Sequence, residues 1–127
     1  NIAVTGLNPH NGMDFKKNLE EEKVIIPAIK EIRNKKIKIL GPLSPDSAFN
    51  DIQTKRINCL IGNYHDQVLP AFKYLNKFKA VNITLGLPFL RISPDHGTAL
   101  DIKEKNIANP DSFLYALNFF EKYYKKI

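Results

Sequence analysis

Two histidines in the sequence follow apolar, β-branched runs of the kind that form strands. His10 comes after residues 2–5, and His65 comes after residues 57–62, with Asp66 beside it. Two imidazoles at equivalent strand ends can share one divalent cation, with carboxylates or waters completing the coordination shell. A loop histidine is more often a hydrogen-bonding residue than a metal ligand, so both interpretations stay open on these residues alone.

Three further side chains would suit an anionic substrate close to such a cation. Lys73 lies eight residues after His65, which is two helical turns and therefore roughly the same face of a helix. Asn82 lies within a later apolar run, and Arg91 follows that run in a segment that we expect to be a loop. These residues could bind a phosphate or a carboxylate. On spacing alone, a solvated lysine and a surface arginine are the simpler interpretation.

A polar segment at residues 95–101 could approach a ligand with its backbone. Gly97 permits close contact, and the neighbouring amides could face a phosphate or a base. An ordinary turn explains the same residues equally well. The sequence contains no G-x-G-x-x-G motif, so a dinucleotide site in this chain would not be of the Rossmann type.

Short strand-like runs alternate with helical patterns along the chain. We expect strands at residues 2–5, 37–40, 57–62 and 80–85, and helices at residues 19–35, 65–76 and 111–125. This alternation predicts an α/β fold, layered, with a mostly parallel sheet flanked by helices. Because no repeat or linker interrupts the pattern, we expect residues 1–127 to form a single unit.

Three local signals refine these elements. Pro27 should kink the first helix, because proline lacks a backbone N–H and its ring clashes with the preceding turn. Gly41-Pro42 should end the second strand, and Ser44-Pro45-Asp46 should start a helix with a capping hydroxyl followed by a proline. The polar clusters fall where strands end, and ligands of α/β sheets bind at such ends.

Composition limits the possible partners. With 43% hydrophobic and 25% charged residues in 127, the chain has the make-up of one globular domain. The net charge of +6 could favour nucleic acid, but the lysines fall mostly on expected helix surfaces and near the C-terminal end, at Lys122, Lys125 and Lys126. No nucleic-acid-binding motif accompanies them, so we expect no nucleic-acid partner and a surface that steers anionic substrates.

The sequence also bears on the compartment. No apolar run approaches the roughly 20 residues that a membrane span needs, and the first residues do not resemble a secretory signal, so we expect no membrane association. Cys59, the single cysteine, lies in an apolar run, where we expect a buried thiol typical of the reducing cytoplasm. Because the chain lacks an initiator methionine and opens with a strand, we expect it to be part of a longer protein.

Five motifs become specific when they are taken together and in order. They are Gly6-Leu7-Asn8-Pro9-His10, Gly41-Pro42-Leu43-Ser44-Pro45-Asp46, Tyr64-His65-Asp66-Gln67, Val81-Asn82-Ile83-Thr84-Leu85-Gly86-Leu87-Pro88-Phe89 and Asp95-His96-Gly97-Thr98-Ala99-Leu100. Over nearly the whole chain, this set resembles the 4-hydroxythreonine-4-phosphate dehydrogenase family.

The resemblance implies a reaction and an assembly. Members of the family oxidise 4-phosphooxy-threonine with NAD, NADP being an alternative. The resulting β-keto acid loses carbon dioxide to give 3-amino-2-oxopropyl phosphate for pyridoxal phosphate biosynthesis. Their fold is similar to that of the isocitrate and isopropylmalate dehydrogenases. The resemblance further implies a cytoplasmic homodimer whose active site lies in an interdomain cleft at the subunit interface.

The resemblance also implies residue roles. His10 and His65 would be metal ligands from different subunits, with zinc as the first expectation and magnesium, manganese or cobalt as alternatives. Asp46 and Asp66 would line the metal and substrate pocket and, together with Lys73, form the catalytic group. The substrate-binding positions match Lys73, Asn82 and Arg91. The expected NAD loop contains Gly97, Thr98, Ala99, Leu100, Asp101 and Asn109.

Two segments depart from the family pattern. Residues 13–18 read Met-Asp-Phe-Lys-Lys-Asn, where the family usually has a glycine- and glutamate-rich loop, and residues 103–106 lack the glycines common in the superfamily. Family members are well over twice this length. Their first half would supply a third histidine ligand and a phosphate pocket, so we expect these 127 residues alone to be inactive.

Two rival hypotheses stay open. The protein could be another dehydrogenase of the same superfamily that acts on a different phosphorylated hydroxy acid. It could also be a truncated, non-catalytic module that serves only folding or dimerisation. Fold-level analogy separates these poorly, because one fold can carry many functions.

Overall fold

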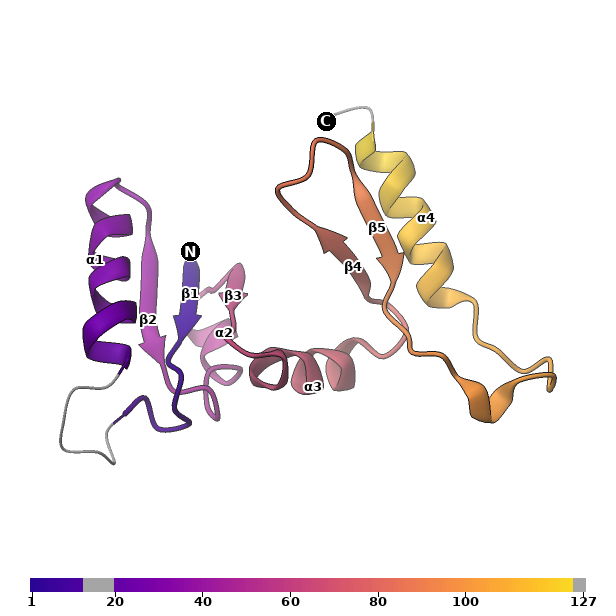
Figure 1. Cartoon of the computed structure of the whole chain (residues 1–127), viewed down its shortest axis with the longest axis horizontal. Helices are drawn as coiled ribbons and strands as arrows, with labels where there is room; N and C mark the ends of the chain where they lie inside the picture. Colours follow the sequence, from indigo (N-terminus) through magenta and orange to yellow (C-terminus); the bar gives the residue numbers. More distant parts are fainter. Residues whose placement is uncertain (13–19, 125–127) are drawn as a thin grey trace. The chain divides into compact units, whose positions relative to one another are not determined.

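The computed structural model describes residues 1–12 and 20–124 (Figure 1). The altered loop at residues 13–18, Leu19, Lys125 and Lys126 lie outside the described residues. The chain divides into two compact units, Asn1–Phe72 and Lys73–Ile127, and each contains its own sheet. A compact unit need not fold on its own. The expectation that residues 1–127 form a single α/β unit therefore stays a prediction.

The first unit is built on a three-stranded parallel sheet with the order β2-β1-β3. β1 (Ile2–Thr5) lies in the middle, between β2 (Ile39–Leu43) and β3 (Cys59–Ile61). All three strands run in the same direction, and the last three residues of β1 are buried. The predicted α/β fold with a parallel sheet is confirmed for this unit.

β2 continues through Gly41-Pro42, where we expected the strand to end. Gly41 has a backbone φ of +130°, and a Cβ atom there would collide with the carbonyl oxygen of Val4 on β1. Glycine therefore permits the close approach of the two strands. Pro42 cannot donate a ladder hydrogen bond, and β2 tolerates this because it is an edge strand of the sheet formed by the described residues.

The helix predicted before β2 forms, but with two geometries. A π-helical turn, η1 (Glu21–Ile25), leads directly into α1 (Ile26–Asn34), and Pro27 occupies the first turn of α1. The N–H of Ile26, the first residue of α1, bonds to the carbonyl of Glu21 in η1, whereas Pro27 has no N–H with which to continue this pattern. The irregularity expected at Pro27 thus coincides with a change of helix type.

The apolar face of this helix forms the core of the first unit. Ile25 and Ile29 pack against Val4 of β1 and Ile39 of β2, and all four side chains are buried. α1 lies alongside β2 (Figure 1). Ile25, Ile29 and Ile32 recur at helical spacing in the sequence, and Ile32 packs against the same cluster, so this spacing marks the buried face.

The helix predicted to start at Ser44-Pro45-Asp46 does not form there. Residues 45–50 make successive turns, in which the N–H of Ser47 donates to the carbonyl of Ser44 and the N–H of Asn50 donates to that of Ser47. These bonds span three residues, as in β-turns. In this segment, the chain becomes helical at α2 (Asp51–Thr54), after these turns.

The prediction of a buried thiol is wrong, because Cys59 is exposed. Within the described sheet, β3 has β1 as its only neighbour, and both Cys59 and Ile61 are open to solvent. An unbroken apolar run predicted a strand covered on both faces, but a run of three residues at a sheet edge shows the same pattern.

α3 (His65–Asn76) has the bounds that the sequence predicted. In the second unit, β4 (Val81–Thr84) pairs with β5 (Arg91–Pro94) in an antiparallel hairpin. The expectations that β4 joins the parallel sheet and that Arg91 lies in a loop are therefore wrong. Gly86 lies in the chain reversal between β4 and β5. Its φ of +83° is a conformation that residues other than glycine rarely adopt.

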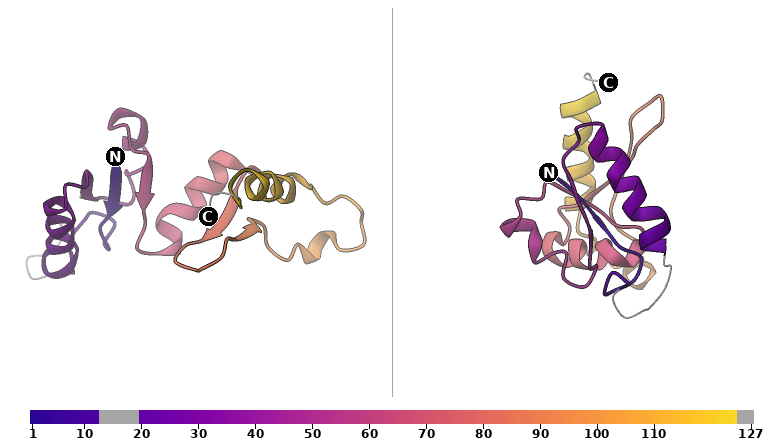
Figure 2. Two further views of the ribbon diagram at one scale, coloured as in Figure 1. Left: turned by 90° about the horizontal axis from the view of Figure 1, so that it is seen from above. Right: turned by 90° about the vertical axis from the view of Figure 1, so that its left-hand side faces the viewer.

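The second unit also contains the short 3-10 helix η2 (Leu100–Ile102) and α4 (Asp111–Tyr123). α4 packs on β4 and β5 (Figure 2). Ser112 is 1% exposed, and its hydroxyl donates to the carbonyl of Ala80 at 3.1 Å and accepts from the N–H of Asp95 at 2.8 Å. One hydroxyl thus joins α4 to residues that flank both strands.

Among the described residues, no helix has both the length and the apolar composition that crossing a membrane requires.

The layering typical of isocitrate and isopropylmalate dehydrogenases stays a prediction.

A buried carboxylate fixes the loop after β1. Glu21 is 2% exposed, and its Oε1 accepts the backbone N–H groups of Leu7 and Asn8 at 2.8 Å each. The side-chain Nδ2 of Asn8 donates to both carboxylate oxygens at 3.1 Å. Burial raises the pKa of Glu21, but the hydrogen bonds from Asn8 and Leu7 outweigh it, so the pKa lies below its ordinary value of 4.5.

Glu21→Gln should lower the free energy of unfolding at pH 7 by about 1.5–3 kcal/mol, the range for hydrogen bonds to a charged group. Because the folded-state pKa is lowered, this stabilisation is complete above the ordinary pKa of 4.5 and is lost as the pH falls through the folded-state value. Urea unfolding of parent and variant, once at neutral pH and once in acid well below that value, measures the effect. The difference between the two proteins should shrink in acid.

Glu22→Gln is the matched control, because Glu22 is exposed and follows Glu21 directly. It should leave stability nearly unchanged at both pH values. A Glu21→Gln deficit of the same size in acid and at neutral pH would mean that the charge of Glu21 does not stabilise the loop.

Candidate functional site

The carboxyl edge of the parallel sheet carries an open cavity of about 560 Å³. Its lining comes from the segments that follow all three strands, because the carboxyl ends of parallel strands meet at one edge. The lining residues are Leu7, Pro9, Pro45, Asp46, Tyr64, Asp66 and Gln67. The structure therefore brings the two predicted pocket aspartates to one cavity.

Each predicted metal ligand lies beside one of these aspartates. The Nε2 of His10 is 3.8 Å from the Oδ2 of Asp46, and both side chains are more than half exposed. The Nδ1 of His65 is 2.8 Å from the Oδ1 of Asp66. With Nδ1 engaged by a carboxylate, Nε2 is the nitrogen of His65 that would bind a cation. Two imidazole–carboxylate pairs thus follow neighbouring strands.

The donor set fits a divalent cation only in part. Imidazole nitrogens with carboxylate oxygens are ligands that zinc and related divalent metals accept. In residues 1–12 and 20–124, however, no three His, Cys, Asp or Glu side chains come close enough together to hold a metal ion. The assignment of His10 and His65 as metal ligands stays a prediction.

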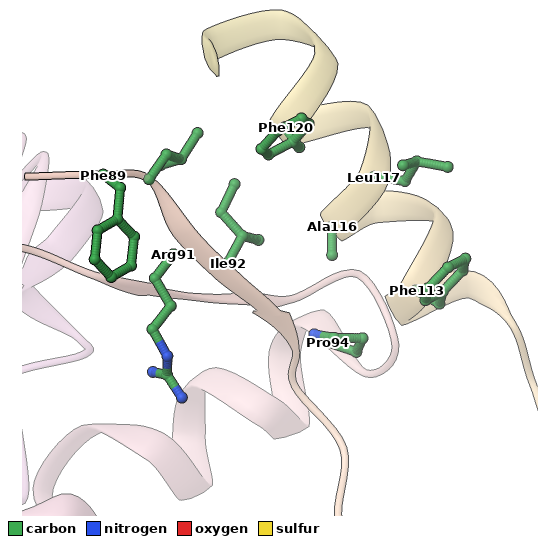
Figure 3. A pocket seen from close by; sticks show the side chains of 9 residues that line it. Phe89, Arg91, Ile92, Pro94, Phe113, Ala116, Leu117 and Phe120 are labelled. Atoms are coloured by element: carbon green, nitrogen blue, oxygen red, sulfur yellow. The ribbon is translucent and has the colours of Figure 1, made fainter. Parts of the chain in front are cut away.

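Two of the predicted substrate residues, Asn82 and Arg91, share one face of the hairpin in the second unit. Asn82 pairs with Ser93 and Thr84 pairs with Arg91, so these four side chains alternate with the apolar residues of the strands. The Nη1 of Arg91 donates to the Oγ1 of Thr84 at 2.7 Å. Figure 3 shows Ile92 directed toward α4 and Arg91 directed away from it. Asn82 and Arg91 therefore lie on the polar face, with a hydroxyl orienting the guanidinium.

Lys73 is held by a carboxylate that the sequence did not single out as its partner. Its Nζ is 3.2 Å from the Oδ1 of Asp95, whose side chain is 14% exposed. The Oδ2 of Asp95 is buried and has no hydrogen-bond partner among the described residues. Because the Lys73 side chain is 44% exposed, the ion pair adds little to stability, about 1 kcal/mol or less, and its main effect is to orient the lysine.

The predicted NAD loop is exposed from Gly97 to Asp101. Ala99 has a φ of +49°, and Leu100, at the start of η2, is 74% exposed. Asn109 has a structural contact of its own, because its Oδ1 accepts the N–H of Asp111 at the start of α4 at 2.7 Å. The cofactor roles of this loop stay predictions.

Residues 1–120 match the family described as pyridoxal phosphate biosynthetic protein PdxA. A 4-hydroxythreonine-4-phosphate dehydrogenase from Sulfurihydrogenibium is 51% identical over 116 residues, which cover 91% of this chain and 35% of the relative. One from Vibrio vulnificus is 50% identical over 117 residues, covering 91% and 36% respectively. The crystal structure of the Klebsiella pneumoniae enzyme of the same name has a TM-score of 0.76 at 36% identity, covering 95% of this chain and 37% of that one.

All three relatives are dehydrogenases by name, which gives the class of protein that the fold and the site resemble. The chain belongs to the PdxA family of pyridoxal phosphate biosynthetic proteins. It spans about a third of the length of the curated relatives that it matches.

Asn109 allows a structural role and a cofactor role to be separated. Asn109→Ala removes the oxygen that accepts the Asp111 N–H and should destabilise the protein by about 0.5–1.5 kcal/mol, as for the loss of one hydrogen bond. Asn109→Asp keeps an acceptor oxygen at a helix N-terminus, where a negative charge is favourable, and should preserve stability. Thermal unfolding measures both effects.

NAD titration of the same two variants tests the predicted cofactor contact. Both should bind NAD more weakly if the side-chain amide touches the cofactor, because aspartate lacks the amide donor. Parental NAD affinity in Asn109→Asp would leave Asn109 with the structural role alone, as the acceptor of the Asp111 N–H.

Proposed function

We propose that this chain is the part of a 4-hydroxythreonine-4-phosphate dehydrogenase that carries two of its metal ligands and its substrate-binding hairpin. The reaction is the NAD-dependent, metal-dependent oxidative decarboxylation of 4-phosphooxy-L-threonine to 3-amino-2-oxopropyl phosphate in pyridoxal phosphate biosynthesis. The observation that carries the proposal is the meeting of Asp46 and Asp66, each beside a histidine, at one cavity on the carboxyl edge of the sheet. These residues alone would be inactive.

His10 and His65 would hold the cation, with Asp66 orienting the His65 ring and Asp46 close to His10. When bound, the cation supplies Lewis-acid stabilisation of the substrate oxygen that changes from hydroxyl to ketone. A nicotinamide cofactor, when bound, would supply the hydride acceptor. Zinc is the first choice for imidazole ligands, and magnesium, manganese or cobalt would also accept the carboxylate oxygens.

The second unit would bind the anionic parts of the substrate. Arg91, oriented by Thr84, offers a planar pair of N–H donors to a phosphate or carboxylate, and Asn82 lies on the same face of the hairpin. Lys73, placed by Asp95, would exchange a proton with the carbon that loses carbon dioxide.

The assembly belongs to the same proposal. It is a cytoplasmic homodimer with an active site shared between subunits, a fold layered as in isocitrate and isopropylmalate dehydrogenases, and an NAD or NADP site at residues 97–101 and Asn109. Support comes from the incomplete ligand set among the described residues and from the dehydrogenase names of the relatives.

The test is turnover by the natural polypeptide that contains this sequence. After metal removal and reconstitution, NADH formation is followed with 4-phosphooxy-threonine and with phosphorylated hydroxy acids that lack its amino group. The proposal requires the first substrate to be preferred. Preference for an analogue would identify another dehydrogenase of the superfamily, and a protein that turns over none of them would be the non-catalytic module.

The two histidines can be assigned to subunits by complementation. His10→Ala or His65→Ala should lower the metal affinity of the homodimer at least about tenfold, the lower end for perturbing a ligand set. If the two ligands of one cation come from different subunits, a heterodimer of the two variants contains one intact site. Metal titration of purified heterodimer should then recover parental affinity in half of the sites.

His96→Ala is the matched control and should bind metal like the parent. Heterodimers without recovery would place both ligands on one chain. Single variants with parental metal affinity would remove His10 and His65 from the site altogether.

Arg91→Lys should weaken substrate binding by about 1–3 kcal/mol, because lysine keeps the charge but loses the planar pair of donors. NAD affinity and the melting temperature of the ligand-free protein should change little, since Arg91 is exposed and its guanidinium bonds to the Thr84 hydroxyl rather than to a core residue. Separate titrations with substrate and NAD measure the two affinities.

Arg56→Lys serves as the control, because Arg56 is an exposed arginine in the other unit. An Arg91→Lys protein that binds substrate normally but melts well below the parent would make Arg91 a structural residue.

A further inference from the structure

Gln67 is neither charged nor a predicted ligand, but it lies between two segments that lead to the histidines. These are residues 6–10, the His10 loop, and residues 62–65, the His65 loop. It is the third residue of α3, is half-buried, and lines the cavity at the carboxyl edge of the sheet. Its side-chain amide bonds to residues from both loops, at sequence separations from 3 to 62.

The oxygen of this amide accepts three hydrogen bonds. The N–H groups of Asn63 and Tyr64, which immediately precede His65, lie 2.7 and 3.2 Å from Oε1. The third donor is the hydroxyl of Thr5 at 2.8 Å, at the end of β1, and Thr5 is fully buried. The oxygen therefore joins the turn before His65 to the last residue of β1.

The nitrogen of the same amide bonds to the other loop. Nε2 donates to the carbonyls of Gly6 and Leu7, at 2.8 and 3.3 Å, in the segment that leads to His10. Every partner of the oxygen is a donor, and both partners of the nitrogen are acceptors. Neither a carboxylate nor an apolar side chain of the same length could satisfy both sets.

We infer that Gln67 is the positioning residue of the proposed metal site, which holds the His10 and His65 loops to one edge of the sheet and thereby raises their affinity for a divalent cation. The inference rests on the proposed metal role of the two histidines. It holds whether one cation takes both ligands from one chain or from two, because Gln67 fixes both loops of its own chain.

The first test is metal affinity in the natural full-length protein, measured by zinc competition with a chromogenic chelator on metal-free protein. Gln67→Met keeps the side-chain length and removes all five hydrogen bonds. Its zinc affinity should fall about 10- to 100-fold, the range for losing an orienting contact around a metal ligand. The visible spectrum of the cobalt-substituted protein should change in band position or intensity, because the ligand geometry changes.

A gentler pair of variants keeps the test informative if Gln67→Met folds poorly. Thr5→Val is nearly isosteric and removes only the hydroxyl that donates to Gln67, whereas Thr5→Ser retains it. Thr5→Val should lower zinc affinity and Thr5→Ser should not, even where the lost methyl group lowers stability.

Arg33→Met separates positioning from general loss of stability. The Nε of Arg33 donates to the carbonyl of Ile39 at 3.1 Å, at the amino end of β2 and therefore at the opposite end of the sheet. This variant should melt earlier than the parent and bind zinc with parental affinity.

The outcomes distinguish the inference from the proposed function. Parental zinc affinity and cobalt spectrum in Gln67→Met, with losses in His10→Ala and His65→Ala, would overturn the inference and leave the metal site in place. Equal losses in Gln67→Met and Arg33→Met would also overturn it. Parental affinity in both histidine variants would overturn the proposed metal site itself.

Discussion

The parallel pairing of β1 with β2 and β3 is the constraint on which the rest of the first unit depends. It sends three polar segments out of the sheet at one edge. Beyond β1 the Gly6 N–H still donates to the Leu43 carbonyl of β2, but the Gly6 carbonyl and the backbone groups of Leu7 and Asn8 need other partners. Two side chains from distant elements bind these groups: the Glu21 carboxylate accepts the N–H groups of Leu7 and Asn8, and the Gln67 amide donates to the carbonyls of Gly6 and Leu7. The segment before His10 is thereby fixed by both its donors and its acceptors.

In the second unit, the two faces of a two-stranded hairpin have different roles: one packs against a helix, and the other carries polar side chains. An isolated hairpin is at best marginally stable in water, so β4 and β5 need an apolar face covered by another element. α4 provides that cover, and the Ser112 hydroxyl links it to Ala80 and Asp95. The opposite face is then free to carry Asn82 and Arg91 without contributing to the core.

Elements set by local periodicity were predictable from the sequence, and elements set by distant partners were not. α3 and the isoleucine face of α1 follow from helical spacing alone. β5 was missed because Arg91–Pro94 contains an arginine and a proline, and it becomes a strand only through its pairing with β4. β2 passes Gly41-Pro42 for a similar reason, since the close approach of Val4 and the free edge of the strand lie outside any local window. Cys59 was placed inside because an apolar run does not reveal whether its strand lies in the middle or at the edge of a sheet.

The same limit applies to the site. The resemblance to the family identified residues that would contact metal or substrate. It did not identify Gln67, Asp95 and Thr84, which orient such residues, because their contacts form only when distant segments come together in the fold. One of them was within reach of pattern analysis. Once Gly86 is taken as a reversal between two strands, period-two alternation places Thr84 on the face of Asn82, and the register then sets it opposite Arg91. The role of Gln67 could not be predicted from a local pattern. Its partners Thr5, Gly6 and Leu7 are 60 to 62 residues away in sequence, and the β1–β3 pairing brings them next to it.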